Sequence, residues 1–127
     1  MIFFANPKSE YIYLKKKIDS KIKKVLESNS YILGKEVENF EKSFSKYIGI
    51  KYSAGVSSGT DAIILALQSI NIKKGDEIIT SSHTAYATIA AIVDVGAIPV
   101  FVDIKRDDFT IDVSKIEKEI SNKTKAI

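Results

Sequence analysis

The chain has 127 residues, of which 45% are hydrophobic and 28% charged, a balance typical of a globular protein with a hydrophobic core rather than of a disordered segment. The formal net charge is only +3 and Arg106 is the only arginine, which argues against a dedicated reader of the nucleic-acid backbone. Cysteine is absent, which excludes disulfides and a thiol nucleophile, and no apolar run reaches the roughly 18 residues of a membrane span. The N-terminus shows no secretion signal, so we expect a cytoplasmic protein.

Residues 1–49 predict two amphipathic helices. Leu14, Ile18, Ile22 and Val25 recur at helical spacing, which indicates a helix over residues 11–27. A second apolar stripe comprises Val37, Phe40, Phe44, Tyr47 and Ile48. Gly34 suits the turn before this stripe and Gly49 its end. We expect residues 1–49 to form an N-terminal helical segment outside the sheet.

Residues 50–127 predict alternating strands and helices. A short strand is expected over residues 51–57. A helix is expected next, with an inner face of Ala62, Ile63, Ala66, Leu67 and Ile70. The Gly75-Asp76 turn then precedes a strand that contains Ile78 and Ile79.

The remaining segments continue this alternation. Residues 86–95 read as a helix that is apolar nearly all round and ends at Gly96, and residues 98–104 read as a strand. A last helix over residues 110–120 is expected to have Asp112 as its N-cap and Val113, Ile116 and Ile120 as its inner face. Such βαβ units predict an α/β fold with a mainly parallel sheet over residues 50–127. A further strand begins in residues 122–127, so we expect this domain to be incomplete and the chain to be part of a longer one.

The first candidate site is the run Ser57-Ser58-Gly59-Thr60-Asp61 at the start of a helix. Gly59 lets a ligand approach the backbone closely, and the N–H groups of Thr60 and Asp61 are expected to face it with the positive end of the helix dipole behind them. The three hydroxyl groups add possible donors to a phosphate. Neither a Walker loop nor the G-x-G-x-x-G fingerprint is present. A phosphate site and an ordinary turn capped by Ser58 or Thr60 both remain open.

The second candidate site is the loop "SSHTAYAT" after the next strand, which carries the only histidine, His83. Ligands of parallel α/β sheets bind at the carboxyl ends of strands, so the imidazole is well placed to stack on a planar ligand, with Tyr86 as a second candidate. No second histidine or cysteine accompanies it as a metal ligand, and we expect no metal site. An exposed, hydrogen-bonded histidine without a binding role is the alternative. Asp103 ends the next strand on the same side.

Three runs in order carry a resemblance to a known family: "YILGKEVENFEKSFSKYIGIKYSAGVSSGTDAIILAL", "KKGDEIITSSHTAYATIAAIVDVGAIPVFVDI" and "FTIDVSKIEKEISNKTKAI". Over residues 4–127 the chain resembles the start of the DegT/DnrJ/EryC1/StrS sugar aminotransferases. The resemblance implies the large domain of the aspartate-aminotransferase (type I) fold and the cofactor pyridoxal 5'-phosphate. It also implies amino transfer from an amino acid, with glutamate as the usual donor, to a nucleotide-linked keto sugar in amino-sugar and polysaccharide biosynthesis. A homodimer is implied too.

The resemblance also implies roles for individual residues. Ser58, Gly59 and Thr60, with the N–H of Asp61, match the turn that holds the cofactor phosphate, and His83 or Tyr86 matches the loop that covers its ring. Many family members have an aromatic residue where this chain has Ala85. Asp103 matches an acid that is structural or near the site. Tyr31 and Gly34 match an N-terminal segment near the active site.

The Schiff-base lysine and the aspartate that pairs with the pyridine nitrogen are expected beyond Ile127, so these 127 residues alone are expected to be inactive. Two alternatives stay open: a non-catalytic remnant or segment of a split protein, and a pyridoxal-phosphate sugar dehydratase of the same family. A nucleotide-binding module without catalysis is disfavoured because the glycine fingerprint is absent. The sequence does not specify the keto sugar or the carbon that is aminated.

Overall fold

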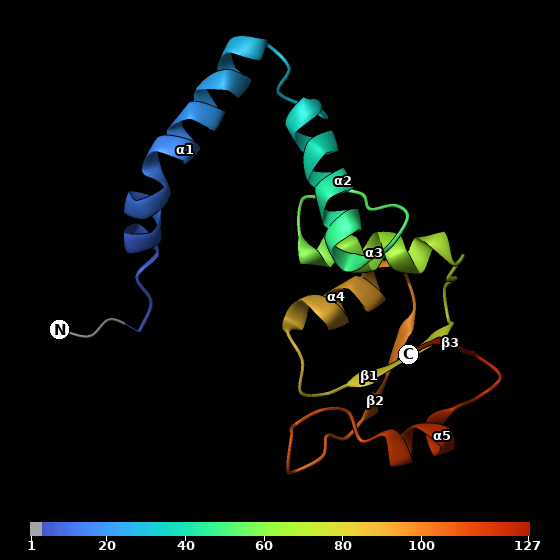
Figure 1. The fold of residues 1–127 in the computed structure, drawn as a ribbon. Helices are drawn as coiled ribbons and strands as arrows, with labels where there is room; N and C mark the ends of the chain where they lie inside the picture. The colour runs from blue at the N-terminus through green and yellow to red at the C-terminus, as the bar shows by residue number, and fades with distance from the viewer. Residues whose placement is uncertain (1–3) are drawn as a thin grey trace. The chain divides into compact units, whose positions relative to one another are not determined.

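The computed structural model describes residues 4–127 and divides the chain into two compact units. The first, Met1–Gly55, is called the helical unit, and the second, Val56–Ile127, the sheet unit. Each is described by itself (Figure 1). Among residues 4–127, no helix combines the length and the apolar character needed to cross a membrane.

The helical unit begins with α1 (Pro7–Ser28), which confirms the first predicted helix and extends it toward the N-terminus. The extension has a local cause: Pro7 occupies the first turn, where its missing N–H costs nothing, and the Asn6 side chain caps the helix by accepting from Ser9 N at 3.3 Å. Asn29 ends the helix in the left-handed conformation, with φ at 54°. No described side chain of α1 is buried within the chain.

The second helix, α2 (Lys35–Ile48), also confirms the prediction. Gly49 ends it at a φ of 81°, where its N–H donates to the carbonyl of Ser45. Ion pairs join α1 to α2, because Lys21 and Lys24 lie 3.4 and 3.2 Å from the Glu36 carboxylate.

The strand predicted over residues 51–57 is wrong. Those residues pair with no strand in the described part of the chain. Instead they are tied to α2: the Ser53 hydroxyl donates to the Glu41 carbonyl at 2.6 Å, and Gly55 N donates to the Glu41 carboxylate at 2.8 Å. A strand needs a neighbouring strand with which its backbone can form hydrogen bonds. Here the Glu41 side chain of α2 accepts from the backbone instead.

The sheet unit confirms the predicted α/β fold. Its elements, in order, are α3 (Gly59–Ser69), β1 (Glu77–Ser81), α4 (Tyr86–Asp94), β2 (Ile98–Val102), the 3₁₀ turn η1 (Val113–Lys115), α5 (Ile116–Glu119) and β3 (Thr124–Ala126). The three strands are parallel in the order β2-β1-β3, so β1 is central. The strand expected to begin near the end of the sequence is β3.

The core of the sheet unit lies between β1, α3 and α4. Its cluster of buried side chains contains Leu67, Ile78, Ile92 and Ala97, with Ile63 and Val95 packed against it. Ile79, the next residue of β1, is 1% exposed, so the central strand is buried on both faces, as parallel sheets usually are.

The predicted inner face of α3 is wrong in part. Ile63 and Leu67 do face the core, but Ala62 and Ala66 are exposed and Ile70 is 55% exposed. Every residue from Ala62 to Leu67 is apolar, so the sequence contains no polar residue that fixes which side turns inward.

The last predicted helix is also corrected. Asp112 does cap it, by accepting from Ser114 N at 3.2 Å. The helix begins as η1, however, and becomes α-helical only at Ile116, so the expected α-helical spacing does not hold. Ile116 is partly buried, whereas Val113 and Ile120 are more than half exposed.

Candidate functional site

The N-terminus of α3 is held by a reciprocal cap. The Ser58 hydroxyl accepts from Asp61 N at 3.1 Å and donates to the Asp61 carboxylate at 3.0 Å, and the Ser57 hydroxyl donates to the same carboxylate. This arrangement resembles a capping box. The expectation that Asp61 offers a free N–H is therefore wrong, because the Ser58 side chain already accepts from it.

Two backbone amides at this helix start do remain available. Within the described residues, neither Gly59 N–H nor Thr60 N–H donates to a protein acceptor. A Cβ added to Gly59 meets nothing within 4 Å, so the space beside this residue is open. The turn thus has two donors without a protein acceptor at the positive end of the α3 dipole, an arrangement that favours an anion such as phosphate.

The same hydrogen bonds make this helix start sensitive to acid. The hydroxyl groups of Ser57 and then Ser58 lower the pKa of the Asp61 carboxyl below its usual 3.8. A lowered folded-state pKa means that the carboxylate stabilises the fold above the unfolded value, and that this contribution disappears as the pH falls through the folded-state value.

Asp61→Asn should therefore lower the free energy of unfolding at pH 7 and change it less at pH 3. Urea unfolding at both pH values measures the difference. Asp94→Asn on α4 is a matched control, since Asp94 accepts no such hydroxyl bonds among residues 4–127. A wild-type-to-variant difference that is equal at both pH values contradicts the prediction.

The loop between β1 and α4 carries both ring candidates. His83 N donates to the Ser81 hydroxyl at 3.1 Å, and the Thr84 and Thr88 hydroxyls bond each other at 3.1 Å across the first turn of α4. The His83 side chain is exposed, and Tyr86 is 84% exposed. Both rings are thus accessible to a ligand.

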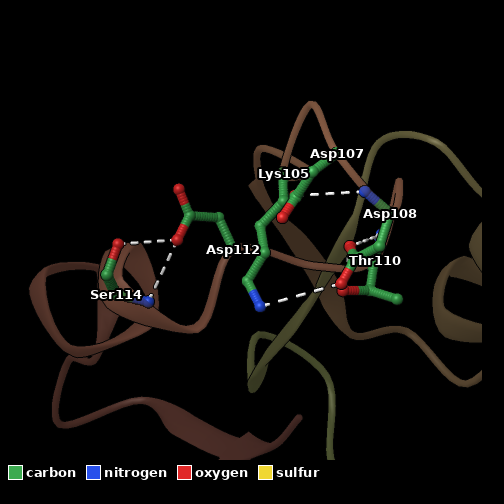
Figure 2. Close-up of polar contacts among 6 residues, drawn as sticks. All are labelled: Lys105, Asp107, Asp108, Thr110, Asp112 and Ser114. Atoms are coloured by element: carbon green, nitrogen blue, oxygen red, sulfur yellow. Dashed lines mark hydrogen bonds and ion pairs between the residues drawn. The ribbon is translucent and has the colours of Figure 1, made fainter.

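The segment after β2 forms a compact loop, shown in Figure 2. Asp108 accepts from both the N–H and the hydroxyl of Thr110, at 2.9 and 2.7 Å, and these bonds lower the pKa of its carboxyl. Lys105 N donates to the Thr110 carbonyl at 2.9 Å, and an antiparallel bridge between Ile104 and Ile111 closes the loop. Asp103 starts this segment with its carboxylate 3.4 Å from Lys115 Nζ.

This loop contains a residue that the sequence did not identify. Phe109 has a φ of 59°, which is unusual for a bulky residue, and its ring centroid lies 6.3 Å from that of His83. The run of aspartates around it reads as a solvated turn, and nothing in hydrophobic spacing signals an aromatic contact there.

The predicted residues of the sheet unit gather at one end. Parallel pairing places the loops after β1 and β2 at the same edge, and Ser82, Asp103 and Lys115 line a common hollow. The helices α3 and α4 pack together, and Figure 1 shows both starting at the same end of the unit. The loops that carry His83 and Asp103 and the start of α3 at Gly59 therefore lie at the end of the sheet unit where α/β folds usually bind ligands.

Tyr31 and Gly34 lie in the helical unit. The Tyr31 hydroxyl donates to the Leu26 carbonyl at 3.1 Å, and its ring is 61% exposed. Gly34 precedes α2, and a Cβ there comes within 2.8 Å of the Ser30 carbonyl oxygen, so glycine is required by this close approach.

Comparison with known proteins now identifies the chain's family. The sequence profile of the DegT/DnrJ/EryC1/StrS aminotransferase family matches residues 13–127. The chain belongs to this family. A relative, dTDP-3-amino-3,6-dideoxy-alpha-D-galactopyranose transaminase of Aneurinibacillus thermoaerophilus, is 42% identical over the whole chain, which covers 35% of that protein.

Two solved structures of similar proteins have the same fold over most of this chain. The structure of S. venezuelae DesV in complex with a ketimine intermediate gives a TM-score of 0.95 at 40% identity, covering 98% of this chain and 33% of that one. The structure of NtdA from Bacillus subtilis with bound cofactor PMP gives a TM-score of 0.85 at 36% identity. The match covers 87% of this chain and 25% of that one. The chain thus spans between a quarter and about a third of the length of these relatives, and it has the fold of the part that it matches.

Proposed function

We propose that the protein is a pyridoxal-phosphate-dependent aminotransferase that moves an amino group from an amino acid, glutamate in particular, to a nucleotide-linked keto sugar. The observation that carries this proposal is the turn at Gly59. It offers two amides without an acceptor among the described residues, in a chain of this aminotransferase family with a relative named as a dTDP-sugar transaminase. We take this turn as the phosphate-binding turn of the family. Pyridoxal phosphate supplies an electron sink for the amino-acid carbon when bound.

In this proposal the α3 start binds the cofactor phosphate. Gly59 N–H and Thr60 N–H donate to it, the Thr60 hydroxyl adds a donor, and the helix dipole favours its negative charge. Ser58 and Asp61 fix the turn by capping each other, so their contribution is to hold the two amides in place.

The loop after β1 covers the cofactor ring. His83 is the first choice for stacking, because its planar side chain is exposed and its loop follows β1 at the edge of the sheet where β1 and β2 both end. Tyr86 is the second choice. Either ring excludes water from one face of the cofactor and limits its rotation about the phosphate anchor.

The proposals on substrate side, location and assembly rest on the resemblance to the family. We assign the segment around Tyr31 and Gly34 to the substrate side, place the enzyme in the cytoplasm, and expect a homodimer. Residues 1–127 contain the phosphate turn and the ring-covering loop, and the lysine that holds the cofactor covalently is expected outside them.

The full-length protein, given pyridoxal phosphate, glutamate and a dTDP-linked keto sugar, is expected to yield 2-oxoglutarate and the amino sugar in equal amounts. Mass spectrometry of the sugar nucleotide and an assay for 2-oxoglutarate measure both products. Residues 1–127 alone should produce neither.

Two other outcomes would contradict the proposal. A deoxygenated sugar without an incorporated amino group indicates the dehydratase alternative. No change in either substrate across a panel of keto sugars, together with no cofactor binding, indicates a non-catalytic segment.

A further inference from the structure

We propose that Phe109 is a positioning residue that holds the His83 imidazole in the orientation that covers the cofactor ring. The inference rests on the proposed function and adds to it a residue from a different loop. It starts from the ring contact between Phe109 and His83, whose centroids are 6.3 Å apart and whose planes are inclined at 45°. This distance and tilt lie in the range of favourable aromatic pairs.

The His83 side chain has little else to hold it. Its backbone N–H is fixed by Ser81, but within residues 4–127 the imidazole itself makes no hydrogen bond or ion pair. An exposed side chain with one aromatic neighbour samples several rotamers unless that neighbour selects one. Phe109 is the ring that can make this selection.

The backbone of Phe109 is held in a conformation that a phenylalanine rarely adopts. Its φ of 59° is in the left-handed region, where glycine and asparagine are favoured. The surrounding loop maintains this conformation: Phe109 N donates to the Lys105 carbonyl at 3.2 Å, and Thr110 is fixed by the Asp108 carboxylate (Figure 2).

The side chain at this position gains little from burial, since Phe109 is 63% exposed. A strained, exposed phenylalanine is a poor choice for stability alone, and strain that the surrounding structure maintains is typical of functional positions. The contact that it gains is the one with His83. We therefore infer that the loop from Lys105 to Thr110 serves to present this ring to the cofactor-covering loop.

The test uses the full-length protein and three substitutions. Phe109→Gly removes the ring and relieves the backbone, so the melting temperature should stay equal or rise. Its dissociation constant for pyridoxal phosphate should nevertheless rise about three- to tenfold, from the size of an aromatic pair. Phe109→Tyr keeps a ring and should stay within about twofold of the wild type. His83→Ala removes the partner and should weaken binding at least as much as Phe109→Gly.

A double substitution separates the inference from simpler explanations. If Phe109 acts through His83, adding Phe109→Gly to His83→Ala should cause no further loss of affinity. A cofactor-independent readout is the imidazole ¹H–¹³C signal of His83, assigned by its disappearance in His83→Ala, which should move in Phe109→Gly as the ring current is lost and stay in Phe109→Tyr.

Three results would overturn the inference. One is an equal loss of affinity from Phe109→Gly with and without His83. Another is an unchanged affinity in Phe109→Gly while His83→Ala weakens binding. The third is an unmoved His83 signal in Phe109→Gly. A wild-type protein that does not bind pyridoxal phosphate would instead refute the proposed function, while the His83 signal still reports the ring pair.

Discussion

Replacing Gly59 with alanine is expected to weaken the binding of pyridoxal phosphate by about ten- to a hundredfold, the value of one hydrogen bond to a charged group. The added methyl group itself has room, since no atom outside its neighbours in the chain and the helix backbone lies within 4 Å of it, but it removes the close approach to the backbone that glycine allows a phosphate. A phosphate held by those amides has to occupy the neighbourhood of that methyl group. Equilibrium dialysis or cofactor fluorescence gives the dissociation constant.

The same substitution should leave the fold intact. Gly59 is the first residue of α3 and its φ is not in the left-handed region, so alanine fits there. Because alanine lowers the conformational entropy of the unfolded chain, it should stabilise the fold by about 0.4–1 kcal/mol. The melting temperature is therefore expected to stay equal or rise while the affinity falls.

Gly55→Ala is a matched control for Gly59→Ala. A Cβ at Gly55 also has room, with ordinary contacts of 3.5 Å to Glu41 and Val37, and its φ is likewise not positive. The residue lies four positions before the phosphate turn, so cofactor affinity should not change. Equal affinity of the Gly59→Ala variant and the wild type would show that the α3 start does not hold the phosphate.

The sequence predicts the framework of this site well because the framework depends on periodicity. The alternation of strands and helices from residue 77 to 102 and the cap at Asp112 appear as predicted. The turns predicted at glycines are confirmed as well. Gly49, Gly75 and Gly96 all have positive φ, which few other residues tolerate.

What the sequence does not predict depends on long-range neighbours. Residues 51–57 have strand-like composition but lack a ladder partner among the described residues, and Glu41 of α2 binds them in its place. The sequence does not predict which side of α3 faces the core, because residues 62–67 are all apolar. The sequence offers Ser58 as an N-cap. It does not show that the Ser58 hydroxyl accepts from Asp61 N while the N–H groups of Gly59 and Thr60 stay without a protein acceptor among the described residues.

Phe109 illustrates the same limit at the site. Its neighbours Asp107, Asp108 and Thr110 indicate a turn, yet the contact with His83 joins two loops that are 26 positions apart in sequence, counted from 83 to 109. Sequence spacing cannot show that the loops after β1 and β2 meet; parallel pairing of those strands brings them to one edge.

The largest loss of stability is expected from Ile92→Ala in α4. Ile92 is 2% exposed and belongs to the cluster with Leu67, Ile78 and Ala97, so its truncation leaves a cavity between α4, α3 and β1. Comparable substitutions cost about 2–5 kcal/mol, against a typical total stability of about 5–15 kcal/mol. Chemical denaturation of the full-length variant, compared with wild type, gives the change in the free energy of unfolding.

Val93→Ala tests whether this loss comes from burial. Val93 is the next residue of the same helix but is 56% exposed, so its truncation should change stability by about 0.5 kcal/mol or less. Equal losses in the two variants would contradict the proposed packing of α4. The comparison also bears on function, because α4 begins at Tyr86, directly after the His83 loop. If docking of α4 through Ile92 fixes that loop, Ile92→Ala should weaken cofactor binding even where the protein remains folded, whereas Val93→Ala should not.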